Sequence, residues 1–254
     1  MEKGKIIEIT YTAKELTTGS VFDTTDEKTA KKEQIYEEGI KYGPITVVVG
    51  GHELITGLDE EVQKMKTGEA KNIKITPEKG FGNRNPKYVA VVPLKQFQKE
   101  KMNPIPGLIV EINGKRGRVQ SVSGGRVRID FNHPLAGREL EYALKVENEI
   151  TDLEKGVEKL FEKYFGMLKE EHKKFSYKDG IVKIEFPMEI EQALSGIKHQ
   201  FSHLLTGHVT GIKEVKYETT MKSKERDAKQ NENAKQETNI KEKKDKNEEK
   251  ENEQ

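Results

Sequence analysis

The sequence predicts an α+β protein, and two patterns carry this prediction. Short stretches with an apolar residue at every second position, as strands have, alternate along the chain with stretches of helical spacing. Three tight-turn dipeptides separate such stretches and predict antiparallel hairpins: Asn113-Gly114, Gly124-Gly125 and Asp179-Gly180. The chain has 254 residues, which is enough for one or two domains with additional segments.

The first part of the chain predicts several strands and one short helix. Residues 5–16 alternate as a strand, and residues 20–23 continue the sheet after a turn. The polar residues 24–41 predict an exposed loop with room for one or two helical turns. A strand over 45–49 ends at two glycines, and the helical spacing of Leu58, Val62 and Met65 follows it. Another strand is expected over 69–75.

Several short strings in this part occur together. Residues 43–59 read Gly-Pro-Ile-Thr-Val-Val-Val-Gly-Gly-His-Glu-Leu-Ile-Thr-Gly-Leu-Asp and place two apolar residues between the strand and the helix. They accompany Tyr11, Val-Phe-Asp at 21–23, Thr-Pro-Glu-Lys-Gly-Phe-Gly at 76–82 and Asn-His-Pro-Leu-Ala-Gly at 132–137. Together these strings resemble the FKBP-type peptidyl-prolyl isomerases, and specifically their SlyD-like branch, over roughly residues 5–150.

The resemblance implies an FKBP antiparallel sheet wrapped on a short helix, with a hollow that binds proline. It also implies that Asp23 lies beside the substrate amide and that the backbone N–H of Ile55 holds a substrate carbonyl. Taken singly, each aromatic residue indicates core packing and Asp23 indicates a turn cap. The side chains that the resemblance places around the hollow are Tyr11, Phe22, Ile45, Leu54, Ile55, Leu58, Phe81 and Tyr142.

Three residues depart from the family pattern. Phe81 stands where the family usually has Tyr, Gly80 where it usually has Ala, and Tyr142 where it usually has Phe. Phe81 keeps an aromatic wall but lacks the hydroxyl that would hydrogen-bond a substrate carbonyl.

Residues 84–131 form an insertion that is too long for a structureless loop. A strand over 88–92, a helical turn over 93–99 and two hairpins predict a small antiparallel domain, after which residues 139–147 return as a closing strand. In SlyD-like proteins an insert at this place in the flap binds exposed apolar segments of unfolded chains. The candidate residues for such a chaperone groove are Val91, Leu94, Phe97, Leu108 and Val110.

Beyond residue 150 the resemblance weakens, and the pattern predicts a small α+β module over 151–218. Thr151 and Glu154 form a capping box for one helix, a hairpin follows, a second helix extends from Ile190 to Leu205, and 209–217 form a last strand. The module could dimerise the chain, cover the isomerase domain or bind a partner. Residues 219–254 are nearly all charged or amide residues and predict a disordered tail.

The predicted units are therefore an isomerase domain of residues 1–83 with 132–150, a chaperone insert of 84–131, a C-terminal module of 151–218 and a tail of 219–254.

Composition narrows the function classes. A net charge of +1 gives no reason to expect nucleic acid or an acidic membrane as a partner. Arg116, Arg118, Arg126 and Arg128 of the insert are ordinary outward positions of strands, although their charge would also suit RNA. The start of the chain lacks a signal-peptide run, and no stretch has the length of an apolar membrane span, which favours the cytoplasm.

No metal and no cofactor are predicted. The chain has no cysteine, so it has no disulfide and no thiolate metal site. His199 and His203 have the i, i+4 spacing of a metal pair, but no carboxylate pattern accompanies them. The nickel-binding tail of many SlyD-like proteins is rich in His and Cys, and residues 219–254 contain neither.

The resemblance implies a peptidyl-prolyl cis/trans isomerase that accelerates proline-limited folding. Its partners would be unfolded or partly folded polypeptides with X-Pro bonds, and macrolide ligands of the family are further candidates. Such an enzyme breaks no covalent bond, because it only has to bind the twisted amide better than the planar one. The alternative is a holdase chaperone whose pocket binds proline segments with little catalysis, and the departure at Phe81 keeps this alternative open.

Overall fold

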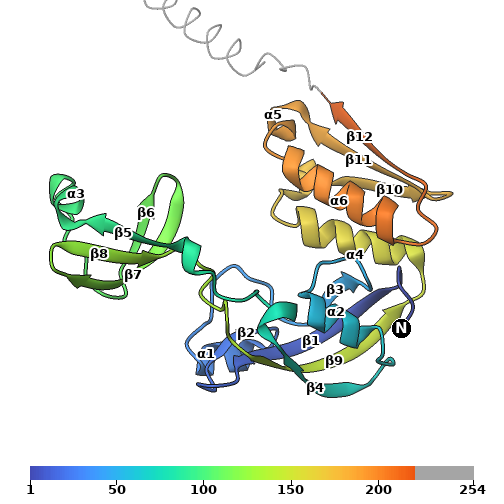
Figure 1. Cartoon of the computed structure of the whole chain (residues 1–254). Coiled ribbons are helices and arrows are strands. Elements are labelled where there is room, and N and C mark those ends of the chain that lie inside the picture. Colours follow the sequence, from blue (N-terminus) through green and yellow to red (C-terminus); the bar gives the residue numbers. More distant parts are fainter. Residues whose placement is uncertain (221–254) are drawn as a thin grey trace, which may run out of the picture.

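The computed structural model describes residues 1–220, which contain three β-sheets and the helices that pack on them (Figure 1). This architecture confirms the predicted α+β class. The predicted disordered tail, 219–254, lies outside the described residues from residue 221 onward, whereas Thr219 and Thr220 end the last strand.

The first sheet is antiparallel throughout and is organised around its central strand, β1. β1 pairs with β2, β3 and β9, and β9 pairs in turn with β4. The pairing of β1 with β9 sets Ile6 opposite Ile150 and Glu15 opposite Leu140, so the chain closes this sheet after the insertion. The strands are β1 (Ile6–Glu15), β2 (Val21–Thr24), β3 (Ile45–Val48), β4 (Ala70–Ile75) and β9 (Leu140–Ile150).

The helix α2 (Thr56–Val62) packs on this sheet and forms its core. Leu58 and Val62 of α2 are buried there, as the predicted helical spacing requires, and Met65 is buried three residues beyond the end of the helix. The segment 24–41, expected as a loop with one or two helical turns, contains the short helix α1 (Glu27–Lys32). Asp26 caps α1, because its side chain accepts a hydrogen bond from the Thr29 N–H at 2.8 Å.

The insertion has a sheet of its own, in the order β5-β8-β7-β6. Its hairpins turn at Asn113-Gly114 and Gly124-Gly125, where all four residues have positive φ, as the sequence predicts. Two 3₁₀ turns, Pro77–Lys79 and Pro86–Tyr88, precede the sheet. The elements of the insert are β5 (Val89–Pro93), α3 (Leu94–Lys99), β6 (Ile109–Ile112), β7 (Lys115–Ser123) and β8 (Arg126–Asp130).

Phe97 and Val110 are corrections to the predicted groove. They are only 4% and 3% exposed and form the insert's small core with Val119, Val127 and Ile129. A core of so few side chains needs its largest members inside, so these two expose little surface to a bound chain. Leu94 and Leu108 are half-buried against the same core.

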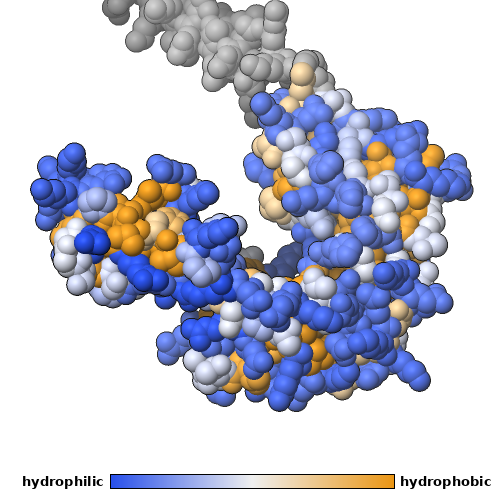
Figure 2. Space-filling model, in the orientation of Figure 1, coloured by the Kyte–Doolittle hydropathy of each residue, from blue (hydrophilic) through white to orange (hydrophobic). Residues whose placement is uncertain are grey.

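Apolar side chains gather on the surface of the insert (Figure 2). Of the nine exposed large apolar residues within 1–220, five belong to the insert, and only Val91 was among those predicted. The five are Tyr88, Val91, Met102, Ile105 and Ile109.

The insert stands apart from the rest of the molecule and is joined to it by two chain segments (Figure 1). Asn132 ties these segments together: its side-chain amide donates to the Asn85 carbonyl at 3.0 Å, and its side-chain oxygen accepts from the Asn85 N–H at 2.9 Å. The Asp130 carboxylate in turn holds Asn132 by accepting a hydrogen bond from its side-chain amide at 2.7 Å.

The C-terminal residues form a third sheet, β10-β11-β12, with helices packed on it. β10 and β11 are an antiparallel hairpin, whereas β12 lies parallel to β11 because the chain crosses over through a helix. The elements are α4 (Leu153–Phe165), a 3₁₀ turn (Glu170–His172), β10 (Lys174–Lys178), β11 (Ile181–Pro187), α5 (Met188–Glu191), α6 (Ser195–His208) and β12 (Glu214–Thr220).

Two details of this region differ from the prediction. The single helix expected from Ile190 to Leu205 is divided into α5 and α6, because the buried Leu194 has turn geometry (φ −89°, ψ −3°). The N-cap of α4 is Asp152 rather than the predicted Thr151. β9 extends to Ile150, so Thr151 lies one residue before the N-cap position. The Asp152 side chain accepts the Lys155 N–H at 3.3 Å.

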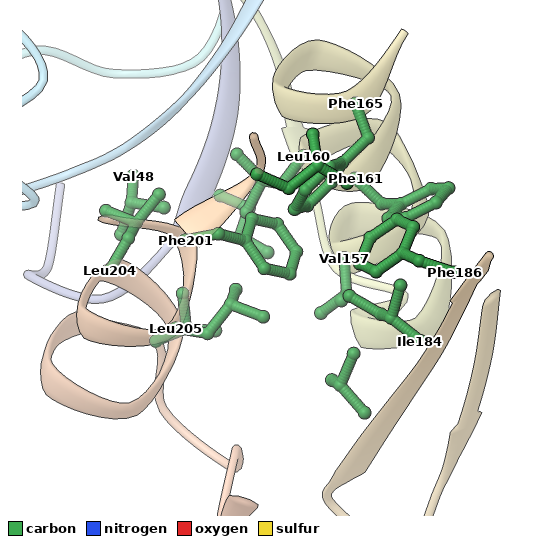
Figure 3. Packing of buried hydrophobic residues seen from close by; sticks show 14 residues of the cluster. Val48, Val157, Leu160, Phe161, Phe165, Ile184, Phe186, Phe201, Leu204 and Leu205 are labelled. Carbon is green, nitrogen blue, oxygen red and sulfur yellow. The ribbon is translucent and has the colours of Figure 1, made fainter. Parts of the chain in front are cut away.

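The C-terminal region and the first sheet share one hydrophobic core (Figure 3). Ile6 of β1 and Val48 of β3 are buried in the same cluster as residues of α4, β11 and α6. Polar contacts surround it: Lys163 of α4 donates to the Thr46 carbonyl and pairs with Glu53, each at 2.8 Å. These two parts of the chain are therefore packed together, whereas the insert has a separate core.

Candidate active site

The loop between β3 and α2 is held by buried polar contacts. Gly50, at φ 74°, turns the chain, and its N–H donates to Asp59 of α2 at 2.9 Å. The Val48 N–H donates to the Glu53 carboxylate at 2.9 Å. These two bonds fix Leu54 and Ile55, which lie half-buried at the start of α2.

Ile55 caps α2 in an extended conformation, at φ −60° and ψ 146°. Its carbonyl accepts the N–H groups of Leu58 and Asp59, so the carbonyl belongs to the helix. Its own N–H has no hydrogen-bond acceptor among residues 1–220. A donor at a helix start beside apolar side chains can hold the carbonyl oxygen of a bound peptide.

Four aromatic rings from separate elements meet next to this loop. The ring centre of Phe22 in β2 lies 6.1 Å from that of Tyr142 in β9 and 6.3 Å from that of Phe81, both edge to face. Tyr11 of β1 lies 5.7 Å from Tyr142. Tyr142 is buried, and the other three rings are half-buried against the core of the first sheet.

One carboxylate stands at this aromatic group. The Tyr11 hydroxyl donates to Asp23 at 2.7 Å, although Asp23 itself is exposed. Burial raises the pKa of the Tyr11 phenol, and the hydrogen bond to the negative Asp23 raises it further. Burial, followed by the charge of Asp23, also raises the pKa of Tyr142. Both phenols therefore stay neutral, and the Asp23 carboxylate is held in one orientation.

His133 lies beside this aromatic group, although its place in the Asn-His-Pro string indicates only a structural role in a turn. Its ring stacks on Phe81 with centres 4.3 Å apart and planes 4° apart. Its Nδ1 accepts the Leu135 N–H at 3.2 Å, which orients the ring. The only sequence signal was the position of the Asn-His-Pro string at the return from the insert, where it must pass close to Phe81.

The structure brings together all nine residues that the resemblance singled out for the proline site. Leu58 and Tyr142 belong to the buried core of the first sheet, and Asp23 is tied to Tyr11. The other side chains pack on that core as half-buried residues: Tyr11, Phe22, Ile45, Leu54, Ile55 and Phe81.

Comparison with known proteins agrees with this arrangement. The profile of the FKBP-type peptidyl-prolyl cis-trans isomerases matches residues 1–98, and a profile described as "FKBP26, IF domain" matches residues 90–135. A short-type peptidyl-prolyl cis-trans isomerase of Methanocaldococcus jannaschii is 35% identical over 148 residues, which are 58% of this chain and 93% of the relative. The chain belongs to the FKBP-type peptidyl-prolyl cis-trans isomerases.

Other FKBP-type relatives are bacterial. A probable 16 kDa FKBP-type isomerase of Pseudomonas fluorescens is 35% identical over 108 residues, covering 41% of this chain and 71% of the relative. The FKBP-type isomerase SlyD of Helicobacter pylori is 30% identical over 115 residues, covering 44% of this chain and 62% of the relative. The recognised family, the isomerase activity and the inserted IF domain are thus confirmed, and the substrates are proline-containing polypeptides.

Within residues 1–220, this FKBP-type isomerase has neither a membrane-spanning helix nor an assembled metal-binding cluster. None of the described helices is long and apolar enough to cross a membrane. No three His, Cys, Asp or Glu side chains in the described part already stand close enough to enclose a metal ion.

Proposed function

We propose that this FKBP-type isomerase captures unfolded chains on its insert and isomerises their X-Pro bonds at the aromatic site. Rotation about the peptide bond crosses a barrier of about 18–20 kcal/mol, because resonance favours the planar form. A half-buried apolar site removes the water that favours the charge-separated planar form, and so binds the twisted amide better.

The residues divide this task between them. The proline ring rests on Ile55 among the rings of Phe22, Phe81 and Tyr142, which supply apolar contact. The Ile55 N–H donates to the substrate carbonyl, which fixes one side of the rotating bond. Asp23, oriented by Tyr11, provides the negative charge beside the twisted amide.

The observation that supports the capture step is a groove of about 460 Å³ between the insert and the chain segments that connect it to the first sheet. Ile109 of the insert lines one part of it, and His133, whose ring stacks on Phe81, lines another. A chain bound at Ile109 can therefore extend to the aromatic site without leaving the protein surface.

Four arginines line the same groove, among them Arg116 and Arg118 on the insert. Arg84 is paired with Asp130, and Arg138 with Glu15 at 2.9 Å. Guanidinium groups donate readily to carbonyl and carboxylate oxygens, so the groove suits an extended backbone as well as apolar side chains. This supports polypeptide binding over RNA binding, since the groove also contains the apolar Ile109 and Pro134.

The test separates capture from chemistry. The triple variant Val91→Ser, Ile105→Ser, Ile109→Ser removes exposed apolar side chains from the insert, and the double variant Met167→Ser, Met188→Ser removes equally exposed ones elsewhere. Two rates are measured: isomerisation of a short X-Pro peptide, and proline-limited refolding of an unfolded model protein.

We expect peptide isomerisation to stay at the wild-type rate in both variants, and refolding acceleration to fall roughly tenfold in the insert variant alone, because about 1.4 kcal/mol of capture energy is lost. Unchanged refolding in the insert variant would refute capture by this surface. No peptide activity in the wild-type chain would favour the holdase alternative, in which the site only binds proline segments.

A further inference from the structure

Four of the six histidines surround one groove, on the side of the molecule where the first sheet meets the C-terminal helices. The groove has a volume of about 690 Å³. His199, His203 and His208 come from α6, and His52 comes from the loop before α2, about 150 residues earlier in the sequence. None of the four takes part in the proposed isomerisation.

Three of these imidazoles are neighbours. The ring centre of His208 lies 5.4 Å from that of His52 and 5.6 Å from that of His203. Zinc–nitrogen bonds of about 2.0–2.1 Å in tetrahedral geometry place ring centres on the order of 5 Å apart. The His203 ring lies beside Gly207, with its Cε1 4.0 Å from the position that a Cβ on Gly207 would take. The ring is therefore displaced along the helix toward His208. Two ring-centre distances are thus close to those of imidazoles around one metal ion, and the side chains have to rotate to bring all three rings onto it.

The backbones that carry these rings are held firmly. A Cβ on Gly51 would lie only 2.8 Å from Leu204 Cδ1, so the loop carrying His52 is seated directly on α6. A Cβ on Gly4 would lie 2.7 Å from the His208 carbonyl oxygen, so the N-terminal segment holds the end of α6 in the same way. The shared core beneath fixes the distance between loop and helix.

The charged groups in the groove already satisfy one another. Lys163 pairs with Glu53 at 2.8 Å, and the Tyr164 hydroxyl donates to the same carboxylate at 3.2 Å. Glu53 also accepts the Val48 N–H, so it is bound to the protein on both oxygens. The imidazoles remain as the groups able to bind a ligand, and Lys163, the one Lys or Arg among the described residues that line the groove, is neutralised by Glu53.

We propose that His52, His203 and His208 bind one divalent transition-metal ion, with His199, one helical turn earlier, as the fourth ligand or as a neighbour of a bound water. Imidazole ligands suit Zn²⁺, Ni²⁺ and Cu²⁺. His52, His199 and His203 are exposed and His208 is half-buried, so the rings can rotate to converge on an ion without unpacking the core. His52 belongs to the isomerase domain and α6 to the C-terminal region, so the ion would join these two parts of the molecule.

From the sequence, the pair His199 and His203, followed by His208, lacked an accompanying carboxylate pattern, and no metal was predicted. Spacing within one helix cannot show that a loop from a distant part of the chain adds a third imidazole. The contact between His52 and His208 changes that assessment.

The experiment titrates ZnCl₂, and separately NiCl₂, into the untagged full chain by isothermal calorimetry. Three single variants are compared with it: His208→Ala, His52→Ala, and the control His172→Ala, which lies outside the groove beside Glu171. We expect one ion per chain, at least tenfold weaker binding in His208→Ala and His52→Ala, and wild-type binding in His172→Ala.

A second readout tests the bridge between the two parts. Zn²⁺ should raise the melting temperature of the wild-type chain, and His52→Ala should lose this rise while keeping the metal-free melting temperature. Wild-type affinity in His208→Ala would place the metal elsewhere and overturn the proposal. Loss of binding in His208→Ala with full binding in His52→Ala would leave a site on α6 alone and overturn the bridge.

Discussion

The hydrogen bond from Tyr11 to Asp23 joins two side chains of the aromatic site, and its effect is positional. Asp23 is exposed, so without Tyr11 its side chain would sample several rotamers. We expect Tyr11→Phe to lower kcat/KM for a short X-Pro peptide about five- to tenfold, because a hydrogen bond worth about 1–1.5 kcal/mol no longer orients the carboxylate. The matched control is Tyr177→Phe, which removes a hydroxyl from β10 in the C-terminal sheet.

The same pair predicts the pH dependence of the wild-type rate. Burial and the adjacent Asp23 raise the pKa of Tyr11, so the phenol keeps its proton well above the ordinary value of about 10. The rate should therefore be flat from pH 7 to about 10. A fall with a midpoint below 10, present in wild type and absent in Tyr11→Phe, would contradict this role.

At the scale of residues, the sequence was informative where short motifs occupy fixed places in a fold. The motif residues of the proline site lie together because their strings belong to the strands of the first sheet or to segments that pack on it. Neither the helical spacing at Phe97 nor the strand alternation at Val110 could distinguish a buried face of the insert from an open groove, and both residues are buried. His133 and His52 depend on contacts between distant segments, which periodicity does not encode.

At the scale of elements, the loop from Gly50 to Ile55 depends on a close approach to α6. A Cβ on Gly51 would lie 2.8 Å from Leu204 Cδ1 and 3.0 Å from the Val48 carbonyl oxygen, and both neighbours are buried. We expect Gly51→Ala to lower the free energy of unfolding by about 1–3 kcal/mol, as overpacking does. Urea denaturation with a constant m-value measures this loss.

The matched control is Gly196→Ala, in the first turn of α6, where nothing lies within 4 Å of the added Cβ. Alanine favours a helix over glycine by up to about 1 kcal/mol, so this variant should be as stable as wild type or more so. Equal losses in both variants would mean that glycine flexibility, rather than the contact with α6, explains Gly51.

Most elements were predictable from the sequence because their signals are local. The Asn113-Gly114 hairpin, the α2 spacing and the strand alternation all depend on neighbours within a few residues. The division between α5 and α6 and the parallel pairing of β12 were not predictable in this way. Both depend on how Leu194 and the crossover helix pack on the third sheet, which is a tertiary effect.

At the scale of the whole molecule, the cores show which parts should unfold together. Ile6 and Val48 of the isomerase domain are buried within the core of the C-terminal region, whereas the insert has its own five-residue core. The sequence predicted a boundary near residue 150, because it shows where elements end and not which cores they share. Residues on both sides of that predicted boundary share one core.

Val48 of β3 and Leu204 of α6 test this joint core, since both are nearly fully buried and both border the space beside Gly51. If the two parts unfold as one unit, Val48→Ala and Leu204→Ala should be non-additive, with a coupling of about 0.5–2 kcal/mol in a double-mutant cycle. The control cycle pairs Val48→Ala with Val119→Ala in the separate core of the insert and should be additive within about 0.5 kcal/mol. Urea unfolding of the four variants in each cycle gives both values. Additivity in the first cycle would mean that the C-terminal region is only tethered to the isomerase domain, and that a metal ion at the histidines would be needed to hold the two together.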